Sequence, residues 1–185
     1  VEAGLRHFLT RDKPVATLED FAGLKTRIVP IPLHKAVWEA VGVNPIGMAY
    51  GEIYSALETG TIEAVEINLS SIQTESLYES ARDVTLTGHY FWPGVIMVAG
   101  PVWASLDADT QAALRTAGRE ATIEAYRKGA AQEAGARAFL EANGVMIGEL
   151  DDPGAMRAAV APVVAEWAGK DPLIARIVEA LGEGS

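Results

Sequence analysis

The stretch over residues 24–69 constrains the fold more than any other part of the chain. A short apolar run over 24–30 and a second over 62–69 flank two segments with helical spacing. This alternation predicts an α/β domain. Each run ends beside a polar side chain, Arg27 in the first and Asn68 in the second. Ligands of open α/β sheets bind beyond the carboxyl ends of the strands, so these two side chains are candidates for holding a carboxylate and a neighbouring polar group.

Helical spacing is clear over 33–41, where apolar residues stand at positions 33, 36, 37, 40 and 41 and Gly42 follows as a stop. On this spacing His34 is expected on the solvated face. Further helices are expected over 52–58, 70–80, 107–143, 152–167 and 171–181. Further strands are expected over 4–10, 43–46, 84–86, 94–99 and 145–147. The run over 94–99 is continuously apolar, which is typical of a strand buried on both faces, and the aromatic stretch 89–93 is expected to connect it to the strand before.

Composition excludes several classes of function. The chain of 185 residues suits one domain or one and a half. Its formal net charge of −10 argues against nucleic-acid and anionic-membrane binding, both of which require clustered Lys and Arg. It has no cysteine and no apolar run long enough to span a membrane. The chain opens on Val1 without a basic leader, so we expect a processed form or a fragment.

No metal or cofactor motif is present. His7, His34 and His89 have none of the spacings of a zinc site, and phosphate-binding glycine loops are also missing. A GxSxG nucleophile motif is absent. Glu63 and Glu66 would point to opposite faces of a strand, which makes an acid–base pair between them a weak interpretation. No cofactor and no metal are therefore expected.

Several motifs in order carry a resemblance to a known family. They are Gly-Leu-Lys-x-Arg-x-Val-Pro over 23–30, the run over 42–60 from Gly-Val-Asn-Pro to Glu-Thr-Gly, and Glu66-Ile67-Asn68. Shorter matches follow over 77–79, 86–89 and 103–106. Together they resemble the DctP-type substrate-binding proteins of TRAP transporters. The resemblance implies a type II periplasmic-binding-protein-like fold, a periplasmic location, and delivery of a small carboxylate ligand to the membrane permease of the transporter.

The resemblance also implies roles for individual residues. Arg27 is expected to pair with the ligand carboxylate, with Asn68 at the same end of the ligand and Arg6 assisting. Tyr50 is expected to line the cleft. Phe91 and Trp92 correspond to variable ligand-contacting positions, and Glu66 is a further candidate. The family commonly has Gly-Gln-Glu-Asn where this chain has Val-Glu-Ile-Asn over 65–68, so the acid stands one place earlier.

The resemblance implies that the chain is the C-terminal part of such a protein. Residues 1–88 are expected to form the ligand-binding lobe two, 89–144 a strand and long helices belonging to lobe one, and 145–185 a return strand to lobe two and the C-terminal helices. The N-terminal part of lobe one is expected to be absent. The strand over 94–99 would then lack its sheet, which predicts self-association through this region.

Two alternatives remain open on the sequence alone. The first is a lyase or isomerase on a similar α/β scaffold that uses Glu66 or His89. The second is a truncated form that mainly oligomerises. For a receptor, the aromatic residues around the expected cleft favour a keto, hydroxy or aromatic acid over a highly hydroxylated one.

Overall fold

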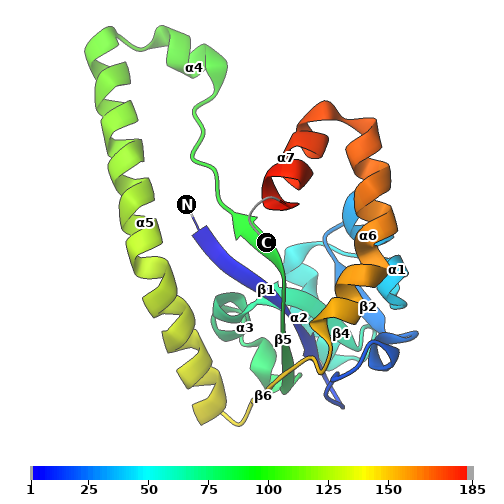
Figure 1. The fold of residues 1–185 in the computed structure, drawn as a ribbon. Coiled ribbons are helices and arrows are strands. Elements are labelled where there is room, and N and C mark those ends of the chain that lie inside the picture. Colours follow the sequence, from blue (N-terminus) through cyan, green and yellow to red (C-terminus); the bar gives the residue numbers. More distant parts are fainter. Residues whose placement is uncertain (1, 183–185) are drawn as a thin grey trace.

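A computed structural model describes residues 2–182, with side chains from Gly4 onward, and shows one six-stranded mixed sheet with helices on both faces (Figure 1). The strands are β1 (Glu2–Thr10), β2 (Lys25–Ile28), β3 (Asn44–Gly47), β4 (Ala64–Asn68), β5 (Asp83–Pro93) and β6 (Met146–Glu149). The helices are α1 (Pro32–Val41), α2 (Ile53–Glu58), α3 (Leu69–Thr74), α4 (Gly100–Ser105), α5 (Ala108–Ala142), α6 (Pro153–Lys170) and α7 (Pro172–Gly182). Three 3₁₀ turns are η1 (Glu19–Phe21), η2 (Tyr50–Glu52) and η3 (Leu77–Glu79). The α/β class is confirmed.

The first strand lies in the middle of the sheet. The spatial order is β3-β2-β4-β1-β5-β6, and β1 runs antiparallel to both β4 and β5. Strand β2 runs parallel to its two neighbours, β3 and β4, and β5 runs parallel to β6. The register of β1 places Arg6 opposite Asn68 on one side and opposite Tyr90 on the other. Residues far apart in the sequence therefore meet near the carboxyl ends of β2 and β4.

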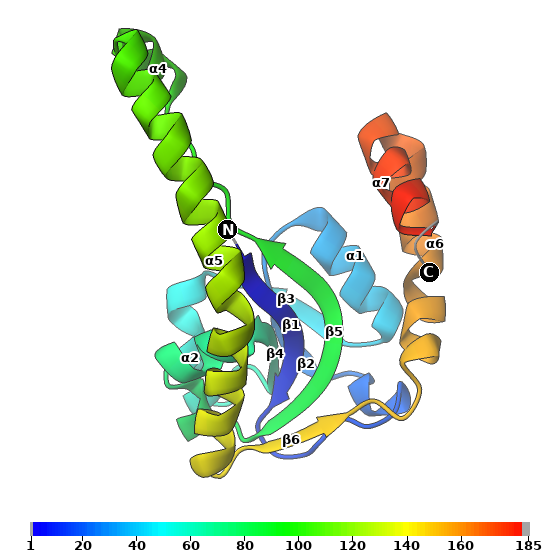
Figure 2. The same cartoon turned by 60° about the vertical axis from the view of Figure 1, so that its left-hand side comes forward.

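Helices cover both faces of the sheet (Figure 2), and a hydrophobic cluster lies between the sheet and the helices on each face. On one face α2, α3 and the C-terminal part of α5 bury Leu9, Val65 and Ile67 of the sheet. On the other face α1 and α6 cover Phe8, whose ring packs against Phe21 edge to face and against a tilted Trp38. Alternation along β1 explains the division, because Phe8 and Leu9 point to opposite sides.

Helix α1 corrects one expectation about the sequence. Its buried residues are His34, Val37, Trp38 and Val41, which follow i, i+3, i+4 and i+7. The buried face of α1 is therefore rotated about the helix axis relative to the face predicted from positions 33, 36, 37, 40 and 41. The rotation follows because the large Trp38 ring packs against the sheet. The expectation of a solvated His34 was wrong. The helix ends as expected at Gly42, whose φ of 99° is left-handed.

Helix α5 is 35 residues long, about 50 Å, and extends well beyond the sheet (Figures 1 and 2). Asp107 caps it by accepting a hydrogen bond from the backbone N–H of Thr110, as the sequence indicates. Among its described residues only Ala136 and Leu140 are buried. The sheet therefore holds the C-terminal part of α5, while its N-terminal part stands free together with α4.

Three other expectations are corrected. The strand expected over 94–99 is not formed: within residues 2–182 these residues belong to no strand, and Val95, Ile96, Met97 and Val98 are exposed. The aromatic stretch 89–93 is not a connection but the second half of β5, paired with β1. The helix expected over 70–80 is interrupted at Ser76, whose φ of 53° is incompatible with a continuous helix. The division expected between residues 88 and 89 falls inside β5, and the assignment of segments to two lobes stays a prediction.

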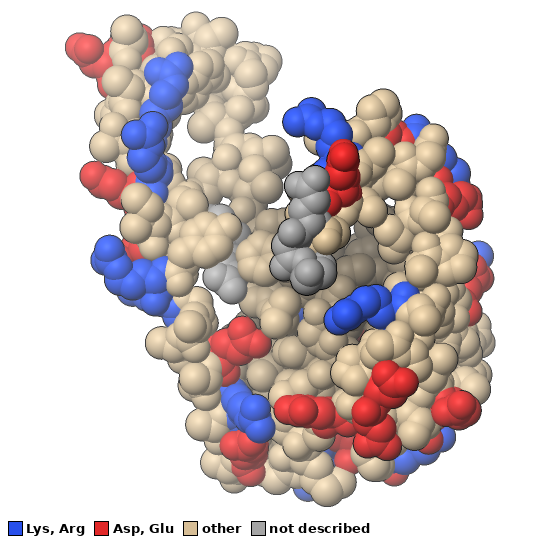
Figure 3. Space-filling model, viewed as in Figure 1, with Lys and Arg blue, Asp and Glu red and all other residues tan. Residues whose placement is uncertain are grey.

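On the face seen in Figure 3, basic side chains lie along α5 with some acidic ones among them, and many acidic side chains gather over the lower part of the molecule. Within residues 2–182, no helix combines the length and the apolar character that crossing a bilayer requires.

Candidate functional site

A buried ion pair between β1 and β4 forms the centre of the candidate site. Nε of Arg6 donates to a carboxylate oxygen of Glu66, and Nη2 of Arg6 donates to the backbone carbonyl of Glu66. Register explains the contact, since Arg6 stands opposite Asn68 and Glu66 is two residues before Asn68 on the same face. Glu66 is 0% exposed. Burial acts to raise the pKa of Glu66, but contacts from His89 and Arg6 outweigh it and lower that pKa below its ordinary value.

Two histidines flank the Glu66 carboxylate. Nε2 of His89 lies 3.5 Å from Oε2, and Nδ1 of His34 lies 3.9 Å from Oε1. Burial lowers the pKa of both histidines, and the opposing attraction of Glu66 does not offset it. Both imidazoles are therefore neutral at neutral pH, and Arg6 remains the charged partner of Glu66.

Aromatic rings from β5 enclose this group. The Arg6 guanidinium lies over the Trp92 ring at 4.7 Å from its centroid, a cation–π arrangement. His34 stacks on Tyr90 at 4.7 Å and meets the edge of Trp92 at 5.8 Å. Phe91, which alternates to the other face of β5, is 46% exposed. The structure thus brings Trp92 to the ion pair and leaves Phe91 away from it.

Arg27, near the end of β2, is anchored by a backbone carbonyl that follows β3. Its Nε and Nη2 both donate to the carbonyl oxygen of Met48, at 3.1 and 3.0 Å. The residue is only 3% exposed, and burial lowers its pKa, an effect that the negative charge of Glu66 opposes. An arginine stays charged despite such a shift. Tyr50, in η2, interacts electrostatically with Arg27 and remains partly exposed.

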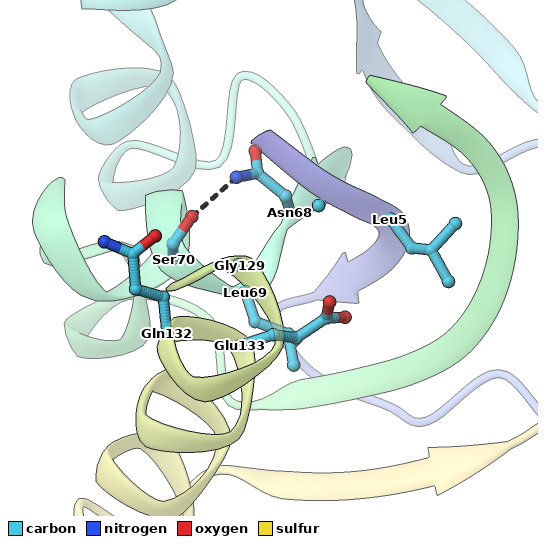
Figure 4. A pocket seen from close by; sticks show the side chains of 8 residues that line it. Leu5, Asn68, Leu69, Ser70, Gly129, Gln132 and Glu133 are labelled. Carbon is cyan, nitrogen blue, oxygen red and sulfur yellow. Dashed lines mark hydrogen bonds between the residues drawn. The ribbon is translucent and has the colours of Figure 1, made fainter. Parts of the chain in front are cut away.

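Asn68 ends β4 and lies beside a small cavity (Figure 4). Its Nδ2 donates to the Ser70 hydroxyl at 2.7 Å, and its Oδ1 accepts from the Ser71 hydroxyl at 2.9 Å. The cavity, of about 90 Å³, lies between β1, α3 and α5. Gln132 and Glu133 reach it from α5.

Several buried polar atoms around Glu66 have no hydrogen-bond partner among the described residues. They are Glu66 Oε1, His34 Nδ1, His89 Nε2 and Tyr90 hydroxyl. A buried polar atom without a partner costs about 1–3 kcal/mol, so such atoms mark places where a bound molecule or an ordered water supplies the missing bond. They occur here in one group, beside two buried arginines.

The structure brings together Arg6, Glu66 and Trp92 in direct contact, with Arg27 as an electrostatic neighbour of Glu66. Sequence reasoning missed His34 and Tyr90 as members of this group. The signal for His34 is its position four residues before Trp38, the largest side chain of α1. Within residues 2–182, no cluster of His, Cys, Asp and Glu has the arrangement of a metal site.

Comparison with known proteins places the chain in a family. The sequence model described as bacterial extracellular solute-binding protein, family 7 (DctP), matches residues 1–171. A solute-binding protein from Chromohalobacter salexigens is 33% identical over 179 residues, which cover 95% of this chain and 52% of that protein. The chain therefore spans about half the length of this curated relative.

Solved structures agree with the fold. The TRAP periplasmic solute binding protein from Chromohalobacter salexigens with bound D-glucuronate superimposes with a TM-score of 0.94 at 29% identity, covering 100% of this chain and 61% of that one. The corresponding protein from Bradyrhizobium with bound galacturonate gives a TM-score of 0.92 at 30% identity, covering 98% and 60%. The expected type II periplasmic-binding-protein-like fold is confirmed.

Proposed function

Because the chain belongs to the bacterial extracellular solute-binding proteins of family 7, we propose that it is the ligand-binding part of a periplasmic receptor for a small organic acid. The receptor delivers this acid to the membrane permease of a TRAP transporter. Arg27 clamps the ligand carboxylate, Asn68 holds the same end, and Arg6 adds positive charge nearby. Trp92 and Tyr50 line the cleft.

The observation that carries the proposal is the burial of two arginines against a single carboxylate. Arg6 and Arg27 are both buried, and Glu66 is the carboxylate that acts on them. A buried positive charge without a counter-ion is costly. A ligand carboxylate supplies the second negative charge. Nε and Nη2 of Arg27 already donate to the Met48 carbonyl, so the anchored guanidinium offers Nη1 and the second N–H of Nη2 to the ligand.

The ligand class is proposed from the solved relatives and from the unpartnered polar atoms. Two relatives bind glucuronate and galacturonate, and the atoms of His34, His89, Tyr90 and Glu66 offer bonds that hydroxyl groups satisfy. We therefore infer a hydroxylated sugar acid in preference to the keto or aromatic acid that the aromatic residues indicate on the sequence alone.

Retention of the ligand, not turnover, is proposed for this site. A lyase or isomerase would need a general acid or base titrating near neutral pH beside Arg27. The pKa of Glu66 is lowered, and its carboxylate is paired with Arg6, so we assign Glu66 the role of a counter-ion in this site. Unchanged galacturonate recovered after long incubation with the protein, seen by NMR, supports a receptor; conversion would identify an enzyme.

Arg27→Ala is expected to abolish organic-acid binding. A ligand that binds only the folded state raises the melting temperature by mass action, so a thermal-shift screen of glucuronate, galacturonate and simpler carboxylates detects it. Removing one charge-assisted clamp costs about 2–5 kcal/mol of binding energy, or at least about 30-fold in Kd. Arg127, an exposed arginine on α5 paired with Glu124, gives the matched control Arg127→Ala. Binding that survives in Arg27→Ala contradicts the clamp.

Self-association through the segment 94–99 is also proposed. Met97 is 83% exposed, Val95 and Ile96 are also exposed, and a groove of about 870 Å³ separates this segment from α5. Burying these side chains against a second copy removes apolar surface from water. Size-exclusion chromatography with light scattering is expected to show a dimer or larger species that Met97→Glu dissociates. Met146→Glu, at an exposed methionine of β6, is the control. A monomer at all concentrations contradicts the proposal.

A further inference from the structure

We propose that Glu66 fixes the charge of the ligand, so that the site accepts a singly charged acid and rejects a dicarboxylate of the same skeleton. The inference rests on the proposed function, because it concerns the selectivity of the same site. Its elements are the positions and charges of three buried residues: Arg6, Arg27 and Glu66.

The first step is the charge balance of the buried group. Arg6 and Arg27 contribute two positive charges and Glu66 one negative charge. The histidines beside Glu66 contribute none at neutral pH, since burial lowers the pKa of each. The group therefore carries a net charge of about +1, and one ligand carboxylate brings it to neutrality.

Within residues 2–182, Glu66 is bonded directly to Arg6 and not to Arg27. One of its carboxylate oxygens accepts from Arg6, and the same guanidinium also donates to the backbone carbonyl of Glu66. Two of the nitrogens of Arg6 are thereby occupied by the protein. The charge of Arg6 is also compensated directly by Glu66, so Arg6 is not an open second clamp for a carboxylate. Arg27 uses the same two nitrogens, Nε and Nη2, but donates them to an uncharged backbone carbonyl, so its charge is not compensated by direct contact.

The second carboxylate oxygen of Glu66 determines which ligand groups are tolerated beside it. Oε1 of Glu66 is buried and has no donor among the described residues, with His34 Nδ1 3.9 Å away. An ionised carboxylate accepts hydrogen bonds and donates none. An uncharged ligand hydroxyl near this carboxylate meets no charge repulsion, whereas a second ligand carboxylate near it is repelled by the negative charge of Glu66. In a site shielded from water that repulsion is strong.

The test uses two open-chain sugar acids with the same carbon skeleton: galactonate, with one carboxylate, and galactarate, with two. Affinities are measured by calorimetry at pH 7.5 on the full gene product that carries these residues, in the wild type, in Glu66→Gln and in Glu120→Gln. Glu120, exposed on α5, gives a matched loss of one charge outside the site. Circular dichroism and melting curves establish that each variant is folded.

We expect the Kd of the wild type for galactarate to be about tenfold or more above its Kd for galactonate. In Glu66→Gln we expect this ratio of the two Kd values to fall by about tenfold or more, so that the two acids bind about equally or galactarate binds more tightly. Glu120→Gln leaves the ratio unchanged. A wild type that binds galactarate as tightly as galactonate overturns the inference, as does a folded Glu66→Gln with the wild-type ratio. If Glu66→Gln does not fold, the wild-type ratio alone decides.

The failure of the inference is distinct from failure of the proposed function. Binding of carboxylates that Arg27→Ala abolishes, without selectivity between one and two carboxylates, would support the proposed receptor function and overturn the proposed role of Glu66. If none of glucuronate, galacturonate, galactonate, galactarate and succinate binds, the proposed function fails and the inference fails with it.

Discussion

Trp38→Ala is expected to lower the free energy of unfolding by about 3–5 kcal/mol, the range for removing a large aromatic side chain from a close-packed core. Trp38 is fully buried between α1 and the sheet. Its ring lies 5.3 Å from that of Phe8, 6.2 Å from that of Phe21 and 4.8 Å from that of His89. The substitution therefore opens a cavity at the point where α1 supports both the core and the candidate site.

Urea denaturation followed by circular dichroism measures this loss, and the slope of the transition tests whether the folded state has also changed in compactness. Trp103→Ala is the control, because Trp103 is only half buried on α4 and stacks on Arg115. It is expected to cost much less. A Trp38→Ala variant as stable as Trp103→Ala would contradict the assignment of Trp38 to the core.

Much of the fold could be predicted because its signals are local. Period-two and period-3.6 patterns, the Gly42 stop and the Asp107 cap each lie within a few residues of the element they define. The face of α1 was misread because two overlapping stripes satisfy the helical period. Packing of one bulky ring, Trp38, decides between them, and that depends on Phe8 in a distant strand.

The prediction of a strand over 94–99 was wrong for a different physical reason. Its apolar residues favour a strand conformation, but a strand forms only where a neighbouring strand supplies backbone hydrogen bonds. Within residues 2–182, Val95, Ile96, Met97 and Val98 belong to no strand and are exposed. Conversely, 89–93 is a strand because β1 lies beside it, and no local pattern encodes that pairing.

The candidate site was predictable in part. Arg27 and Asn68 follow from their positions at the ends of two apolar runs, and Arg6 from the family resemblance. The surroundings of Glu66 were not predictable, because they depend on the register of β1 between β4 and β5. That register sets Arg6, Glu66 and Tyr90 on one face although they are separated by tens of residues.

Arg6→Met is expected to destabilise the protein by about 3–5 kcal/mol at neutral pH, since it leaves Glu66 buried without its charged partner. Methionine retains apolar contact with the Trp92 ring that the arginine covers, so the loss reports the ion pair more than the packing. The double variant Arg6→Met/Glu66→Gln removes both charges and is expected to recover a large part of the lost stability.

The pH dependence of the same variant has a definite sign. In the wild type the folded-state pKa of Glu66 is below its ordinary value, so the ion pair contributes stability at pH values above about 4.3 and loses it as the pH falls through the lowered pKa. Without Arg6, two of the causes that lower this pKa are lost, so burial raises the folded-state pKa of Glu66 relative to the wild type. The carboxyl then takes up a proton as the pH falls toward that raised pKa, and the destabilisation of Arg6→Met relative to the wild type shrinks. Urea denaturation at pH 5 and pH 8 measures both differences. A penalty that is equal at the two pH values, or larger at pH 5, would show that Arg6 stabilises the fold by packing and not by pairing with an ionised Glu66.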